Sequence, residues 1–277
     1  LFVIVDARSM QELPAERIAR FHRTLGANHT KLLALRGSTY LGKDGPVYPT
    51  SRRSTVTKQE SVSNPDRQLI DLYTWSTPNG RKVSIMLEEL GLAYRVFPID
   101  ISRGDQHTED FVAISPNHKI PAIVDHETGT ELMESGAILM YLAHKTGKLM
   151  SSIGPQFWQE MEWLMFQMGH IGPMLGQTHH FVKFNPGKSP YAEARYSKEN
   201  ARLYQVLETR LGDRNYIAGD YSIVDIATWP WISRYQFQQM DLNDYPRLKD
   251  WYLRIAERPA VQKGYAVPQE LSVPIPG

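Results

Sequence analysis

The sequence predicts an α/β domain followed by an all-α domain. Three observations support this fold class: strand and helix patterns alternate between residues 69 and 147, a Ser-Ser-Ile-Gly-Pro segment at 151–155 has the composition of a linker, and only helical patterns follow it. A chain of 277 residues is long enough for two hydrophobic cores. We expect an N-terminal extension, two domains and a tail, at residues 1–67, 68–149, 155–265 and 266–277.

The α/β domain is predicted to begin with a strand, a turn and a helix. Leu69 to Tyr73 is a run of strand-forming residues, and a Thr-Pro-Asn-Gly turn follows it. The next helix places four apolar residues on one face and ends at Gly91, where a C-terminal cap is expected. Those apolar residues are Val83, Met86, Leu87 and Leu90.

Three further strands and a second helix complete this domain. The strand candidates are residues 94–101, 121–125 and 131–133, and the helix runs from Ser135 to near Gly147. The resulting order, β-α-β followed by β-β-α, is the arrangement of thioredoxin-like domains.

The second domain is predicted to be entirely helical. A Ser222–Asp225 capping box starts one of its helices. Three apolar stripes at helical spacing mark others, and we interpret their side chains as core. The stripes are Phe157, Met161, Leu164, Met165 and Met168; Leu203, Leu207 and Leu211; and Leu248, Trp251, Tyr252 and Ile255.

Composition excludes several classes of function. The chain has no cysteine, which rules out disulfides, Cys-ligated metals and an enzyme thiol nucleophile, so any thiol chemistry must use a sulfur supplied by a small molecule. Its longest apolar run, Ala137 to Ala143, is too short to span a membrane. A net charge of +1 argues against broad nucleic-acid binding. We therefore expect no membrane and no nucleic-acid partner.

The N-terminal extension is expected to be partly irregular. Residues 37–66 are rich in Gly, Pro, Ser, Thr and Asn, as loops are, whereas residues 11–25 can form a short helix. The extension carries most of the chain's basic excess, so a mitochondrial presequence remnant is an alternative, although Glu12 and Glu16 count against it. The start at Leu1 is consistent with either a fragment or a processed N-terminus.

Four ordered motifs resemble one protein family. Residues 77–80, 114–126, 134–142 and 172–181 look like the nu class of the glutathione transferases, which includes bacterial and fungal disulfide-bond oxidoreductases and is related to the yeast nitrogen-regulating prion protein. The resemblance extends over about residues 68–265. It implies the glutathione transferase fold, in which a thioredoxin-like domain precedes an all-helical one.

Thr77 and Asn79 are the candidate catalytic residues. The start of a helix offers free amides and the positive end of its dipole, which stabilise a thiolate. The resemblance implies that the glutathione sulfur lies near these two residues. Thr77 followed by Pro78 is also typical of a helix cap with no further role, and the hydroxyl of Ser76 is an alternative thiolate contact.

The resemblance also implies three residues that bind the glutathione backbone. Ile120 precedes a cis-proline and offers its backbone to the cysteinyl part, while its side chain is expected in the core. Ser135 caps its helix and binds the γ-glutamyl carboxylate on the free amides, and Glu134 takes the ammonium group.

Three more candidates are Gln106 and Arg195, which lie outside these motifs, and Lys119, which lies within the second. The resemblance implies Gln106 near the glycyl end of glutathione, and Lys119 is expected to pair with a carboxylate, although each can simply be a solvated side chain. Arg195 is expected to pair with a second glutathione, with a salt bridge to Glu199 as the alternative. No metal site is expected, because adjacent histidines such as His179 and His180 point apart on a helix.

These residues predict a glutathione-dependent disulfide-bond reductase or glutathione transferase that uses two bound glutathiones, with no tightly bound cofactor. Conjugation of electrophiles and reduction of hydroperoxides stay open as reactions of the same site. The alternatives are a non-catalytic glutathione-binding regulatory module and, less favoured, a structural translation-factor subunit. The resemblance further implies a homodimer, and the need for reduced glutathione favours the cytoplasm over mitochondria.

Overall fold

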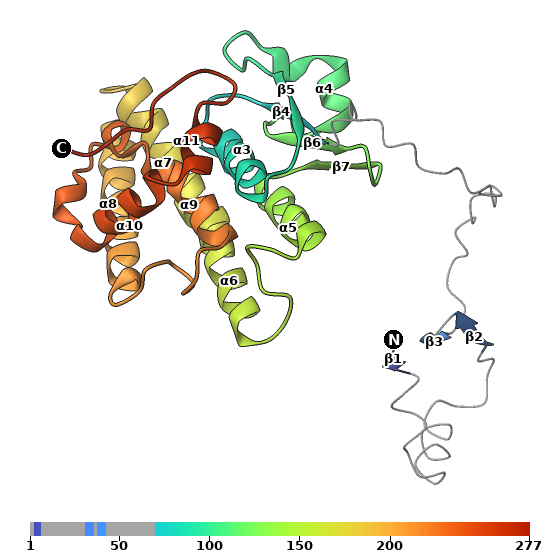
Figure 1. Ribbon diagram of the computed structural model, residues 1–277. Helices are drawn as coiled ribbons and strands as arrows, with labels where there is room; N and C mark the ends of the chain where they lie inside the picture. The colour runs from blue at the N-terminus through green and yellow to red at the C-terminus, as the bar shows by residue number, and fades with distance from the viewer. Residues whose placement is uncertain (1–2, 7–30, 36–37, 43–69) are drawn as a thin grey trace. The chain divides into compact units, whose positions relative to one another are not determined.

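The computed structural model describes residues 3–6, 31–35, 38–42 and 70–277 (Figure 1). The chain divides into two compact units, residues 1–63 and 64–277, and each is described by itself.

The first unit contains a three-stranded antiparallel sheet in the order β1-β3-β2. None of these strands was predicted, and one of them lies in the stretch expected to be loop. Each has only four or five residues and lies in a part of the chain without sustained periodicity. The helix predicted at residues 11–25 lies outside the described residues. The strands are β1 (Val3–Asp6), β2 (Lys31–Leu35) and β3 (Ser38–Gly42).

The second unit opens with a four-stranded mixed sheet in the order β5-β4-β6-β7, as a thioredoxin-like domain requires. The central strand β4 pairs parallel with β5 and antiparallel with β6. Helices α3 and α5 pack together on one side of this sheet, and α4 lies on the other (Figure 1). The bounds are β4 (Ile70–Thr74), α3 (Pro78–Leu90), β5 (Tyr94–Pro98), η1 (Asp105–His107), α4 (Glu109–Ile114), β6 (Ala122–Asp125), β7 (Thr130–Met133) and α5 (Ser135–Thr146).

Only helices follow, as the sequence predicts. The first four form one continuous helical run, in which η2 and η3 are π-helical turns. None of the helices in the described residues has the length and apolar character that a membrane span requires. The bounds are α6 (Pro155–Phe166), η2 (Gln167–Ile171), α7 (Gly172–Thr178), η3 (His179–Phe184), α8 (Pro190–Leu211), α9 (Ile223–Ile232), η4 (Tyr235–Gln238), η5 (Leu242–Asp244), α10 (Pro246–Ala256) and α11 (Pro259–Tyr265).

Helix α9 forms the centre of the helical domain. All ten of its residues are buried, and the predicted capping box at its start is present. Asp225 of this box also accepts hydrogen bonds from the backbone N–H of Ile217 and from the indole of Trp251, at 3.0 and 2.8 Å. Burial raises the pKa of Asp225 to about 6. The box therefore joins the start of α9 to α10 and to the preceding loop.

The two predicted domains share one core through α3, which packs against α9 and α11. The closest approach is at Gly264, where an added Cβ would lie 2.5 Å from the Cα of Ile85. The hydroxyl of Ser84 donates to the carbonyl of Gly264 at 2.6 Å. Nearby, Arg258 pairs with Glu89 through two hydrogen bonds of 2.7 and 2.8 Å. These contacts fix the helical domain against the α/β domain.

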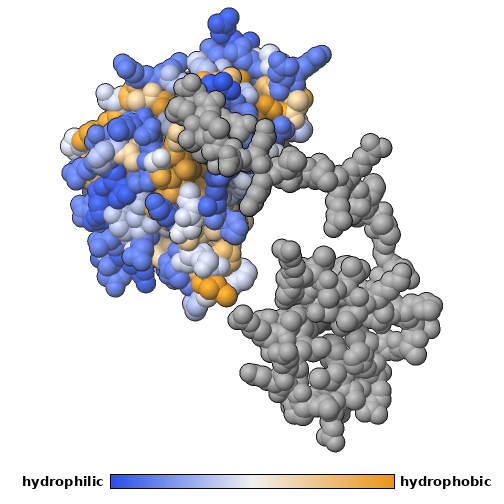
Figure 2. Space-filling view, turned by 45° about the vertical axis from the view of Figure 1, so that its right-hand side comes forward, coloured by the Kyte–Doolittle hydropathy of each residue, from blue (hydrophilic) through white to orange (hydrophobic). Residues whose placement is uncertain are grey.

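The predicted core stripes are confirmed on α8 and α10, whose apolar residues are buried. On α6 the prediction was wrong for Met165, which is 49% exposed. Four of the five stripe residues lie in this twelve-residue helix, and only Leu164 among them is fully buried, whereas Met168 lies in η2. The outer edge of α6 therefore remains at the surface. The face shown in Figure 2 is mostly hydrophilic, with hydrophobic residues in separate patches.

Candidate functional site

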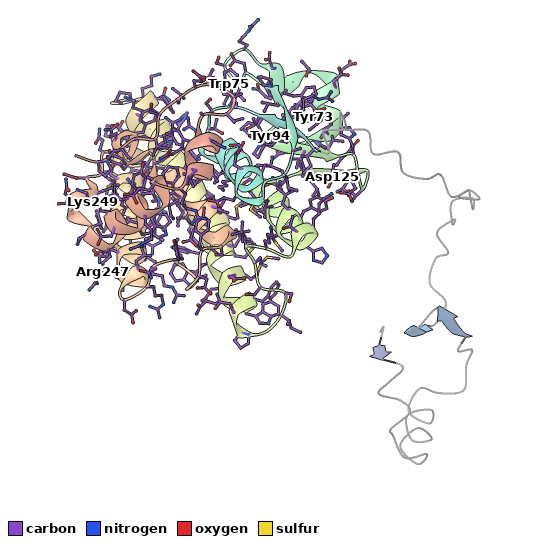
Figure 3. The ribbon with its side chains drawn as sticks, viewed as in Figure 1. Tyr73, Trp75, Tyr94, Asp125, Arg247 and Lys249 are labelled. Carbon is purple, nitrogen blue, oxygen red and sulfur yellow. The ribbon has the colours of Figure 1, made fainter. Side chains whose placement is uncertain are left out.

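A cavity of about 270 Å³ lies where the start of α3, the loop before β6, the start of α5 and the η2 turn meet. Five of the eight predicted site residues line it: Asn79, Lys119, Ile120, Glu134 and Ser135. The others in its wall are Ser115, Asn117, Pro121, Met133 and Met168. Trp75, labelled in Figure 3, marks the loop between β4 and α3 that leads into this region.

Thr77 is the N-cap of α3, as its sequence context predicts. Its hydroxyl oxygen accepts a hydrogen bond from the backbone N–H of Gly80 at 3.2 Å, and Pro78 occupies the first helical position. The cap therefore uses the oxygen of Thr77 to start the helix, and Thr77 is not among the residues that line the cavity.

Asn79 lies one residue further along α3 and does line the cavity. Its side-chain Oδ1 accepts a hydrogen bond from the indole Nε1 of Trp231 in α9, at 3.1 Å. An indole N–H can only donate, so this contact fixes which end of the amide is oxygen. The Asn79 Nδ2 group has no hydrogen-bond partner among the residues that the structure describes, which leaves it available as a donor to a ligand.

Trp231 was not singled out as a functional residue, and its own position is set by close packing. An added Cβ at Gly172 or Gly176 would lie 3.5 or 3.4 Å from its ring, an ordinary van der Waals contact, so both glycines of α7 lie directly against the indole. The imidazole of His179 stacks on the same ring at 5.7 Å. Burial lowers the pKa of His179 to about 4, so this imidazole is neutral at pH 7.

The loop before β6 has the expected cis peptide bond between Ile120 and Pro121. Ser115 is fully buried, and its hydroxyl donates to the carbonyl of Lys119 at 2.8 Å, which fixes the course of the loop. Ile120 is half-buried in the cavity wall and is not part of the core, so the expectation for its side chain was wrong. The Ile120 side chain is only partly covered because it borders the cavity.

The start of α5 differs from the prediction in one respect. Ser135 is the first residue of the helix, and Glu134 occupies the N-cap position without a capping hydrogen bond from its side chain. Ser135 therefore does not cap the helix, and the amides of the first turn stay open towards the cavity. Glu134 has φ of 70°, a conformation that a non-glycine residue adopts at a cost and that is frequent at functional sites.

Lys82 is a further polar residue at this site that the sequence analysis missed. It is 1% exposed and lies one turn after Asn79 on α3. Its Nζ lies 3.3 Å from the hydroxyl of Ser135, 2.8 Å from Oε1 of Gln167 and 3.5 Å from the sulfur of Met168. The available signal was its spacing of three residues from Asn79, which places both on one helix face.

The two remaining predicted residues lie elsewhere. Arg195 lines a separate surface cavity of about 820 Å³ together with His170, Met174 and Tyr191. Glu199, its alternative partner, forms its ion pair with Arg202. Glu199 and Arg202 also line this cavity, with Ala194, Tyr196 and Lys198.

Gln106 lies in η1 and is not among the residues that line either cavity. Its side-chain nitrogen is 3.3 Å from Nε2 of His107. The two adjacent histidines point apart, since His179 is buried and His180 is exposed. Within residues 70–277 and the three described strands, no group of three His, Asp or Glu side chains is arranged to hold a metal ion.

Comparison with known proteins finds two matching domains, one in the α/β part of the chain and one in the helical part. Models of the glutathione S-transferase N-terminal and C-terminal domains match residues 69–144 and 171–259. The Escherichia coli disulfide-bond oxidoreductase YfcG is 48% identical over 198 residues, covering 69% of this chain and 92% of that protein. The chain belongs to the glutathione S-transferase family.

Solved structures of other glutathione transferases share this fold. A Burkholderia graminis enzyme, described with two glutathione molecules per subunit, is 42% identical with a TM-score of 0.68, covering 73% of this chain and 89% of that one. A Pseudomonas putida enzyme, described with one glutathione disulfide per subunit, is 41% identical with a TM-score of 0.68, covering 74% and 94%. The predicted fold and family are thus confirmed.

Proposed function

We propose that this glutathione S-transferase is a glutathione-dependent disulfide-bond reductase. The observation that carries the proposal is the Asn79 amide, whose orientation is set by Trp231 and whose nitrogen is free to donate beside the start of α3. A thiolate placed there would receive this hydrogen bond and the favourable field of the helix dipole. Both effects lower a thiol pKa, and the thiolate is the nucleophile in thiol–disulfide exchange.

The same cavity offers a binding group for each part of glutathione. The uncapped first turn of α5 and the hydroxyl of Ser135 suit the γ-glutamyl carboxylate, and Glu134 suits its ammonium group. The Ile120 backbone suits the cysteinyl part, and Lys119 suits the glycyl carboxylate. The sulfur would then lie near Asn79. Gln106 is assigned to the glycyl end only as an expectation from family resemblance.

Because the chain has no cysteine, glutathione must supply both sulfurs. The thiolate of the first glutathione attacks one sulfur of the substrate disulfide, forming a mixed disulfide and releasing the other sulfur as a thiolate, which takes up a proton. A second glutathione thiolate then attacks the glutathione sulfur of the mixed disulfide. This step forms oxidised glutathione and releases the second substrate thiol.

The two-glutathione mechanism is supported by the relatives described with two glutathiones or with one glutathione disulfide per subunit. We assign Arg195 to the second glutathione, because its guanidinium is exposed in a cavity and has no ion-pair partner within the described part of the chain. Glutathione is thus a co-substrate in this proposal, and no tightly bound cofactor is required.

The proposal is tested by reduction of a small organic disulfide, coupled to glutathione reductase and NADPH. We expect Asn79→Ala to lower kcat/KM about 100-fold, the effect of removing one donor to a developing anion at an active site. Asn215→Ala is the matched control, because it removes the same amide from an exposed loop after α8. Equal rates for wild type and Asn79→Ala would contradict the assignment of Asn79.

A non-catalytic regulatory module remains the alternative, and turnover separates it from the enzyme. Glutathione binding without disulfide reduction by the full chain would favour the module. The same assay on a chain lacking residues 1–65 tests whether the extension takes part. Full activity in that variant would restrict the reaction to the second unit.

We also propose a homodimer, supported by family resemblance and by exposed apolar side chains at Ile153, Trp158 and Met165, in and just before α6. A cytoplasmic location is proposed from the requirement for reduced glutathione. Conjugation and detoxification are further reactions that the same thiolate would support.

A further inference from the structure

The amine of Lys82 is buried beside the candidate glutathione cavity without an acidic partner. Its three contacts are the neutral side chains of Ser135, Gln167 and Met168, and it forms no ion pair within the described residues. A buried ammonium group without a counter-ion is costly, because burial removes its hydration. Such a site favours either loss of the proton or arrival of an anion.

Ser135 connects this amine to the cavity. Its oxygen accepts from Lys82 and also lies in the cavity wall at the start of α5. Because the Lys82 amine donates to this oxygen, the serine hydroxyl is free to direct its own hydrogen towards a ligand. A carboxylate bound there would be linked to Lys82 through one hydroxyl group.

We propose that Lys82 is a positioning residue that supplies, through Ser135, the counter-charge for the γ-glutamyl carboxylate of glutathione, so that ligand binding is coupled to protonation of Lys82. The inference rests on the proposed glutathione site. It adds to that site a buried group that never touches the ligand but makes binding depend on pH.

The charges around Lys82 support this coupling. Burial lowers its pKa to about 7, and Glu134 at the start of α5 raises it only in part. The residues of η2 that contact it, Gln167 and Met168, are uncharged, and the polar neighbour on α5 is the hydroxyl of Ser135. In the ligand-free protein at pH 8 the amine is therefore mostly neutral. A bound carboxylate would stabilise the charged form of Lys82, so the amine would take up a proton from solvent.

The test is isothermal titration calorimetry with S-methylglutathione, because this ligand has no ionisable thiol. Titrations at pH 8 in buffers of different ionisation enthalpy give the number of protons taken up. The ligand's own amino group contributes equally in every variant, so the difference between wild type and Lys82→Met isolates Lys82. A pKa of about 7 predicts roughly 0.9 proton more uptake in the wild type.

Affinity gives a second readout. Between pH 7 and pH 8, we expect binding to weaken about fivefold more in wild type than in Lys82→Met, since only the wild type must recover this proton. A merely structural role for Lys82 would change affinity equally at both pH values.

The Gln167→Glu variant keeps Lys82 and provides a second test if Lys82→Met fails to fold. The new carboxylate would lie at the Gln167 position, 2.8 Å from the amine, and would keep Lys82 protonated without ligand. We expect this variant to lose the extra proton uptake and to bind S-methylglutathione at least tenfold more weakly at pH 7. Proton uptake equal to wild type in Gln167→Glu or Lys82→Met would overturn the inference.

The outcomes separate this inference from the proposed function. A wild type that reduces disulfides without Lys82-dependent proton uptake refutes the role of Lys82 and leaves the reductase intact. A wild type with the predicted uptake but no disulfide reduction supports the role of Lys82 and refutes the reductase.

Discussion

Two neighbouring residues of α3 show how differently its two faces are used. Arg81 and Lys82 are both cations, and both are almost completely buried. The guanidinium of Arg81 faces α11, where it lies 3.6 Å above the ring of Tyr265 and donates from Nε to the Tyr265 carbonyl. The amine of Lys82 faces the cavity and contacts neutral groups that also line or adjoin it.

The difference lies in what compensates each charge. An aromatic face attracts a guanidinium permanently, because the ring and the cation are both fixed parts of the folded chain. Lys82 has no such partner in the described structure, so its charge is either lost by release of a proton to solvent or balanced by a bound anion. One face of α3 therefore packs against α11, and the other borders the candidate site.

The largest effect is expected on the packing face. Gly264→Ala places a Cβ 2.5 Å from the Cα and 2.6 Å from the backbone nitrogen of Ile85, and neither atom can rotate away. We expect a loss of about 3 kcal/mol in unfolding free energy, measured by chemical denaturation. Glutathione-dependent activity of the remaining folded protein should be little changed. Wild-type stability in this variant would contradict the close packing of α11 on α3.

An intermediate effect is expected on the binding face. Trp231→Phe removes the N–H that orients the Asn79 amide but keeps an aromatic ring beside His179. We expect kcat/KM for disulfide reduction to fall about tenfold, because Asn79 can then rotate its oxygen towards the thiolate. The unfolding free energy should change by only about 1 kcal/mol. If Trp231→Phe loses stability but keeps its activity, the orienting role assigned to Trp231 is contradicted.

The smallest effect is expected for Arg81→Met. Burial lowers the pKa of Arg81 to about 10, which means that folding at pH 7 carries the cost of a buried charge. We expect an unfolding free energy that is unchanged or raised by about 1 kcal/mol. Any advantage of the variant should shrink above pH 10, where the folded wild type loses that charge. A loss of more than about 2 kcal/mol at pH 7 would show that stacking on Tyr265 outweighs desolvation.

Much of the fold was predictable because its signals are local. The predicted strands and helices of the α/β domain match the structure to within a few residues, and Gly91 and Gly147 end their helices with positive φ, as expected of caps. The stripe around Trp251 is buried because its apolar residues all lie on one side of the helix, and only that side can face the core.

The site residues were predictable only where a sequence motif fixes the local backbone, as at the start of a helix or before a cis-proline. Asn79, Ile120 and Ser135 meet in one cavity because the starts of α3 and α5 follow strands β4 and β7 and Ile120 precedes β6 of the same sheet. Arg195 belongs to another cavity, and the cap role of Ser135 was wrong because the helix begins at Ser135 and Glu134 holds the N-cap position. Contacts between distant side chains leave no pattern in a single sequence.

The π-helical turn η2 determines in which direction around the helix axis the side chains of α7 and η3 point. Successive residues of an α-helix are separated by about 100°, so a single extra residue in one turn shifts the azimuth of each later side chain. Gln167 faces α3 before this shift, and Gly172 faces the indole of Trp231 after it. A shortening of this turn by one residue would misalign the contact of Gln167 with Lys82 against that of Gly172 with Trp231, the two contacts that orient the polar groups on either side of Asn79.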